Sequence, residues 1–238
     1  MKSTLLFKTA LPVLLAFSLN TISAKAQQNK DIALTNFNEV TVSSGIDLYL
    51  TQSHSENIKV TAHEDLLKNV VVEKQGSNLI VKYKNSQGWG RTFKGQSIKV
   101  YVNYKTLNAI TASGGSDVYG QNTLRTQKLN IRASGGADLS LDIHADDLVL
   151  TTSGGADVKL KGKVKNMIVQ TSGGSDVEAY QLISDYAKVT ASGGSDASVY
   201  VNKGLEASAS GGSDINYKGN AALNKTSSSK SGDVTHIK

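Results

Sequence analysis

The chain of 238 residues has a formal net charge of +6, no cysteine, 22 glycines and a single proline. Three of its lysines and none of its acids lie in residues 1–26, so residues 27–238 carry only +3, too little and too dispersed a charge to indicate binding to nucleic acid or to an anionic membrane. Abundant glycine and scarce proline favour many short strands joined by tight turns, with almost no helix.

The first 26 residues have the pattern of a secretory signal peptide. A basic start at Lys2 precedes a mostly apolar run, Leu11–Leu19, and Ala24-Lys25-Ala26 has the small-residue spacing of a cleavage site. The apolar run is shorter than the roughly 20 residues that a membrane helix needs. We therefore expect an exported protein, located in the periplasm, at the cell surface or outside the cell. It should form a single domain over residues 27–238, with no membrane span after signal cleavage.

Residues 37–110 are predicted to form an N-terminal coil and hairpins. Val40–Leu50 alternates apolar and polar residues around Ser44-Gly45-Ile46-Asp47, a variant of a motif that recurs later in the chain. We expect this segment to be the founding coil of a repeated structure.

The pattern then changes to two alternating runs, 70–74 and 78–83, which flank Gly76 and indicate a β-hairpin. A further strand is predicted over 98–104. Residues 85–95, which contain Trp89, are expected to form an exposed loop.

A five-residue motif, Ser-Gly-Gly followed by Ser or Ala and then Asp, recurs six times in residues 111–217, and successive copies start 18–21 residues apart. We single out one glycine and the aspartate of the founding coil and of each copy as candidate turn residues: Gly45, Asp47, Gly114, Asp117, Gly135, Asp138, Gly154, Asp157, Gly173, Asp176, Gly193, Asp196, Gly211 and Asp214.

Apolar residues recur at fixed places on both sides of the motif. A period near 20 residues, with two short strands and a Gly-Gly corner, is best satisfied by coils stacked along an axis, each covering the apolar face of the next. The predicted fold class is therefore all-β, a single-stranded parallel β-helix. Residues 218–238 contain Ser231-Gly232-Asp233, a degenerate copy, and are expected to form the terminal coil and tail.

The aspartates alternate with apolar residues after the turn, so we expect them to point outward in one column along the stack. Carboxylates about 4.8 Å apart repel by about 1 kcal/mol in water. Backbone N–H groups of the Gly-Gly turns, helped by solvent, could offset this repulsion, or the column could bind cations such as calcium. The nine-residue period of calcium-binding β-rolls is absent, so the first explanation is preferred and no cofactor is predicted.

The Ser44-Gly45-Ile46-Asp47 segment followed by the Ser-Gly-Gly-x-Asp ladder resembles the bacterial head GIN domain family of putative autotransporter adhesins, of the Bacteroidetes type. The resemblance covers roughly residues 37–217. It implies a pectin-lyase-like β-helix without the catalytic residues of those enzymes, and a role in adhesion.

We therefore predict a non-enzymatic binding protein whose partner is a surface glycan or a protein. One alternative is a polysaccharide lyase or glycosidase, although a glycosidase needs two carboxylates in unlike environments and the repeated acids share one environment. Another alternative is a cell-envelope scaffold that binds a second protein. An uncapped first coil would invite edge pairing and so a homo-oligomer. Four tyrosines that follow the aspartates are expected to cap the second strand of their coils: Tyr119, Tyr180, Tyr200 and Tyr217.

Overall fold

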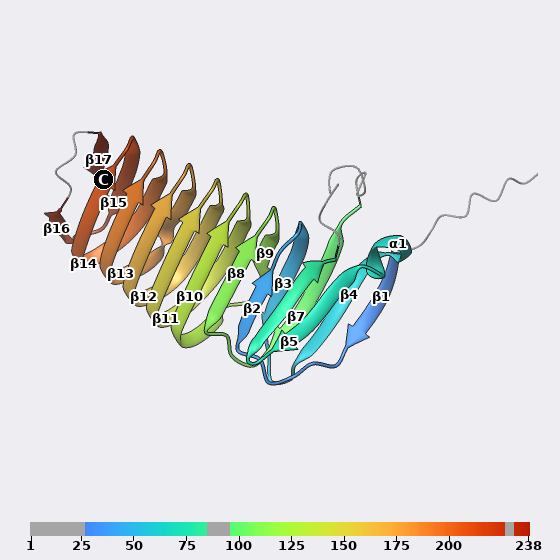
Figure 1. The fold of residues 1–238 in the computed structure, drawn as a ribbon. Coiled ribbons are helices and arrows are strands. Elements are labelled where there is room, and N and C mark those ends of the chain that lie inside the picture. Colours follow the sequence, from blue (N-terminus) through green and yellow to red (C-terminus); the bar gives the residue numbers. More distant parts are fainter. Residues whose placement is uncertain (1–26, 85–95, 227–230) are drawn as a thin grey trace, which may run out of the picture.

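The computed structural model describes residues 27–84, 96–226 and 231–238. The predicted signal peptide and the predicted loop around Trp89 lie outside these residues. The chain forms a parallel β-solenoid, as predicted, and Figure 1 shows its coils stacked along one axis. In each regular coil, one stretch of strand leads into a Ser-Gly-Gly turn and another leads away from it. We call the two outer surfaces the pre-turn face and the post-turn face.

The regular coils pair in parallel, and equivalent residues of the motif lie opposite one another. Asp138 pairs with Asp157, which pairs in turn with Asp176, so the repeat period sets the register. The strands of this region are β8 (Ala109–Ser113), β9 (Asp117–Gly120), β10 (Leu124–Ser134), β11 (Asp138–Ser153), β12 (Asp157–Ser172), β13 (Asp176–Ser192), β14 (Asp196–Ser210), β15 (Ser213–Lys218), β16 (Ala222–Lys225) and β17 (Gly232–His236).

The founding coil is the first coil in the sequence but not the first in the stack. It consists of β2 (Glu39–Val42) and β3 (Ile46–Gln52), which pair with β8 and β9 on one side. On their other side they pair with β6 (Asn78–Tyr83) and β7 (Ile98–Tyr104). The chain therefore places the coil of β6 and β7 on one side of β2 and β3, and then continues the stack on their other side with β8 and β9.

Antiparallel strands cover this N-terminal end of the stack. β5 (Val70–Gln75) pairs with β6, β4 (Asn57–His63) pairs with β7, and β1 (Gln27–Ile32) pairs with β4. The first coil is thus capped, and the edge strand β1 is short, polar and exposed, a form that discourages further pairing. β5 pairs only with β6 and so keeps one unpaired edge, and edge pairing between copies of the chain stays a prediction at this end.

The only helix in the described residues is α1 (Glu64–Leu67), and none is long and apolar enough to cross a membrane. The core is a set of inward columns, one residue from each coil. Leu205 is 1% exposed because coils lie on both sides of it. Leu223, its partner in the last coil, is 41% exposed, so the C-terminal end of the column is open.

Candidate binding faces

The Gly-Gly corners stack directly on one another, and their two glycines have different tasks. Gly173 and Gly174 both have positive φ, 70° and 74°, which favours glycine. A Cβ at Gly173 would lie 3.1 Å from the backbone nitrogen of Gly154 in the preceding coil, whereas one at Gly174 meets nothing within 4 Å. The first glycine permits close stacking as well as the turn, and the second permits only the turn.

The founding coil has a serine in place of the first glycine. Ser44 has a φ of 72°, a left-handed conformation that is unfavourable for a residue with a side chain. No Ser-Gly-Gly turn precedes it in the stack, because β6 and β7 below it are joined by the longer segment 84–97.

The variable fourth position of the motif is buried, because it lies on the side of the strand opposite the outward aspartate that follows it. Its residues are Ser116, Ala137, Ala156, Ser175, Ser195 and Ser213, and all are 0% exposed. The Ser213 hydroxyl lies within donating distance of two carbonyl oxygens, Ser210 O of its own corner at 2.7 Å and Ala191 O of the preceding coil at 2.8 Å. Only a small side chain fits here, and the restriction to Ser or Ala was the available signal.

The degenerate last copy obeys the same rule. Gly232 pairs with Ser213, and Asp233 pairs with Asp214. Its single glycine therefore takes the small buried position, and Ser231 lies opposite the Gly-Gly corner of the preceding coil, where it accepts from Gly212 N.

The predicted aspartates form one outward column. Two of their carboxylates accept hydrogen bonds: Asp196 Oδ1 accepts from Asp214 N at 3.1 Å, and Asp117 Oδ2 accepts from the Tyr119 hydroxyl at 3.2 Å. The backbone donor is the next aspartate's N–H rather than an N–H of the Gly-Gly turn, which corrects the expectation for this contact.

Repulsion along the column is only partly offset. Burial, followed by the neighbouring carboxylates, raises the pKa of Asp176, and burial also leads the causes that raise the pKa of Asp47 and of Asp117. Within residues 27–84, 96–226 and 231–238, no three His, Cys, Asp or Glu side chains are grouped so that they could hold a metal ion. We therefore assign no metal to the column.

A tyrosine stack lies beside the aspartates on the post-turn face. The Tyr49 ring lies between those of Tyr101 and Tyr119, with centroid distances of 4.9 and 5.3 Å and interplanar angles of 17° and 24°. Lys59 Nζ lies 5.2 Å from the Tyr101 centroid at one end. Burial raises the pKa of Tyr119 to about 12, so its hydroxyl remains a donor at neutral pH.

A hollow continues this face along the axis. Ser140 follows Tyr119 in the same column, and Lys159 and Glu178 follow Ser140. These residues line a hollow of about 560 Å³ together with Tyr180 and with Leu141, Leu160, Lys161, Gln181 and Ser198. Lys159 and Glu178 form an ion pair of 3.3 Å. The stack and the hollow make one continuous strip, which we call the tyrosine strip.

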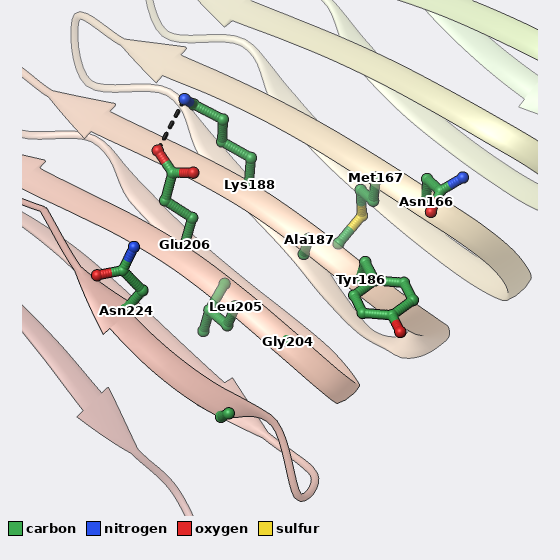
Figure 2. Close-up of a pocket in the computed structure, with 10 residues that line it drawn as sticks. Asn166, Met167, Tyr186, Ala187, Lys188, Gly204, Leu205, Glu206 and Asn224 are labelled. Atoms are coloured by element: carbon green, nitrogen blue, oxygen red, sulfur yellow. Dashed lines mark ion pairs between the residues drawn. The ribbon is translucent and has the colours of Figure 1, made fainter.

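A second hollow, of about 380 Å³, lies on the pre-turn face near the C-terminal end, and Figure 2 shows its lining. Tyr186, half exposed, stands beside Gly204, and the Lys188–Glu206 ion pair of 2.7 Å lies across from it. Asn166 and Asn224 lie farther along the rim, and the buried Met167, Ala187 and Leu205 are the apolar part of the lining. We call this the Tyr186 hollow.

The four tyrosines expected to cap their strands do not occupy one position. Tyr119 points outward into the stack, whereas Tyr217 is 7% exposed and its ring stacks on that of His236 at 4.6 Å. Tyr119, Tyr180 and Tyr200 follow the aspartate of their motif by an even number of residues, whereas Tyr217 follows it by an odd number, which places Tyr217 on the other face of the strand. The recurrence does not define one structural role.

Comparison with known proteins adds a family and several structures of the same fold. The family model described as putative auto-transporter adhesin, head GIN domain, matches residues 36–221. A putative adhesin from Bacteroides fragilis has a TM-score of 0.81 and 23% identity, over 90% of this chain and 98% of that one.

Two more solved structures are similar. A putative adhesin from Parabacteroides merdae has a TM-score of 0.70 and 21% identity, over 89% of this chain and 96% of that one. A putative lipid binding protein from Parabacteroides distasonis has a TM-score of 0.70 and 20% identity, over 89% and 97%. No curated protein matches the chain. At these identities the likeness is one of fold.

Proposed function

The chain belongs to the putative auto-transporter adhesin, head GIN domain, family, and from this premise we propose that it is an exported, non-enzymatic protein that binds a surface ligand in adhesion. Export rests on the predicted signal peptide, so the N-terminus of the secreted protein should be Gln27. The ligand belongs to one of two classes, a glycan or a protein.

The tyrosine strip is the observation that carries this proposal. Its side chains come from successive coils and are held at the fixed spacing of a parallel sheet, roughly 4.8 Å per coil. Aromatic rings, an ion pair and hydroxyl groups follow one another along a single column. A rigid surface of this kind loses little entropy when it contacts an extended ligand, which favours binding.

The electrostatics of the aspartate column argue against a glycosidase. The pKa values of Asp47, Asp117 and Asp176 all move upward, and in each case burial is the first cause. A glycosidase instead divides two carboxyl groups between unlike environments, so that one is an acid and the other a nucleophile or base. The repeated carboxylates are better explained as part of the ladder.

The proposal can be tested with the secreted protein, residues 27–238. Arrays of glycans and of extracellular-matrix proteins, together with a reducing-sugar assay on every glycan bound, should give saturable binding without release of reducing ends. Phosphatidylcholine vesicles test the lipid binding named for the Parabacteroides distasonis protein. Release of reducing ends, or binding to vesicles only, would overturn the proposal.

The strip itself is tested by Lys159→Ala and Tyr119→Ala, both on the outer surface. Each should weaken binding to the array ligand about tenfold if the strip holds it. Lys82→Ala is the matched control for Lys159→Ala, because it removes a lysine that is ion-paired with Glu73 at 2.9 Å and lies in the lining of neither hollow.

A further inference from the structure

We propose that the Tyr186 hollow binds one pyranose residue of a neutral oligosaccharide. This inference rests on the proposed binding function and names a ligand class for a second face of the protein. It concerns a site separate from the tyrosine strip, because the hollow lies on the pre-turn face.

The fold keeps the Tyr186 ring open to a ligand. Gly204, in the coil that follows, pairs with Tyr186, and a Cβ on Gly204 would lie 3.2 Å from Tyr186 Cδ1. The missing side chain lets the ring lean over the neighbouring coil, while the residue stays 50% exposed. A large aromatic side chain half open to water, on a rigid sheet, presents apolar area at low entropic cost. The C–H surface of a sugar ring matches such an aromatic surface.

The rim supplies partners for sugar hydroxyl groups. In the described part of the chain, neither the Asn224 amide nor the Tyr186 hydroxyl has a hydrogen-bond partner. The amide and the phenol can each donate and accept hydrogen bonds, and a sugar hydroxyl can serve as either partner. Asn166 Nδ2 is held by Asp147 Oδ1 at 2.8 Å, which fixes the orientation of that amide.

Charge balance selects a neutral sugar. The two charged groups of the lining, Lys188 and Glu206, neutralise each other across 2.7 Å. Lys203, whose Nζ lies 5.7 Å from the Tyr186 centroid, is likewise paired with Asp185 at 2.9 Å. Lys163 and Lys165, whose charges act on Asp185, lie outside the lining, so an anionic sugar in the hollow would meet no unpaired cation among the lining residues and would approach Glu206.

The lining as a whole has the composition of a ligand pocket. The exposed Tyr186 ring is its main apolar surface, because the side chains of Met167, Ala187 and Leu205 beneath it lie in the core, and a small number of polar groups converge from the rim. Its volume of about 380 Å³ lies at the lower end of the range for small-molecule sites, roughly 300–1,000 Å³. This size suits a single sugar residue of a longer chain that runs across the face.

Isothermal titration calorimetry of the secreted protein tests the site, with cellotetraose, chitotetraose and mannotetraose as neutral probes and trigalacturonate as the anionic probe. Tyr186→Ala should weaken binding of the preferred neutral probe at least about tenfold. Tyr186→Phe, which keeps the ring, should weaken it less than about threefold. Ile168→Ala is the matched control, because Ile168 is an exposed apolar residue of the same face, 40% exposed and outside the lining, and it should leave binding unchanged.

The outcomes separate this inference from the proposed function. Unchanged binding in Tyr186→Ala, equal losses in Tyr186→Ala and Ile168→Ala, or preference for trigalacturonate overturns the site. Failure of every neutral probe to bind overturns it as well, while binding to an array protein would leave the adhesion proposal standing. Melting temperatures within a few degrees of the wild type establish that each variant is folded.

Discussion

The two glycines of one corner should differ in their sensitivity to alanine. An alanine in the left-handed region costs about 1–2 kcal/mol, and the lower entropy of the unfolded chain returns about 0.5 kcal/mol of it. Gly174→Ala, with open space around the new methyl group, should therefore destabilise the protein by about 1 kcal/mol. Gly173→Ala has the same conformational cost and also places its methyl group 3.1 Å from Gly154 N.

That contact is with backbone, which cannot move without disturbing the ladder: Gly154 O accepts from Gly136 N at 3.2 Å. Overpacking of this kind adds about 1–3 kcal/mol, so Gly173→Ala should cost about 2–4 kcal/mol. Urea unfolding followed by circular dichroism gives the midpoints for comparison. Gly174→Asn should recover part of the loss, because asparagine tolerates positive φ, whereas Gly173→Asn should not. Equal costs for the two alanine variants would refute the division of tasks within the corner.

Three further predictions concern the columns. Tyr49→Ala removes two ring contacts at once and should lower the free energy of unfolding by about 1–3 kcal/mol in urea titration, with Tyr101→Ala, at the end of the stack, costing less. Folding raises the pKa of Asp117 above its unfolded value of about 3.9, so its ionisation destabilises the fold as pH rises through and above that value. Asp117→Asn should therefore stabilise the protein at neutral pH, by less than about 1 kcal/mol because solvent screens this partly exposed group, and should not do so near pH 3, as thermal melts at both pH values can show. Leu205→Ala should cost about 2–5 kcal/mol and Leu223→Ala only about 1 kcal/mol, since the second side chain is already 41% exposed; similar costs in denaturant titration would contradict an open last coil.

The regular part of the fold was predictable because the repeat specifies its own register. Equivalent aspartates recur at nearly constant spacing, and each coil has apolar columns that only a neighbour can cover, so Asp138, Asp157 and Asp176 had to align. The same argument placed Asp47 in the column, although its coil has Ser44 in place of a glycine.

The stacking order at the N-terminal end was not predictable in the same way. A coil has two free edges, and its sequence pattern says nothing about which edge a later segment will occupy. Residues 78–83 and 98–104 read correctly as strands, but they lack the Ser-Gly-Gly motif that would have revealed their place behind β2 and β3.

The candidate site depends on that unpredicted order. Tyr49, Tyr101 and Tyr119 are far apart in the sequence, and they meet only because β3 lies between β7 and β9. The same insertion places Asp47 between Lys99 and Asp117, and the lysine charge lowers the pKa of Asp47 against the effects of burial and of Asp117.

The post-turn face therefore changes character along its axis. Its N-terminal end combines the aromatic stack with Lys99, the lysine that precedes the acids in their column, and the later coils continue that column with carboxylates only. A ligand that runs along the axis meets these two regions in a fixed direction. An extended ligand on the tyrosine strip should for this reason have a fixed position, with one end always at the tyrosines, whereas an identical coil repeated throughout would offer equivalent positions all along the axis.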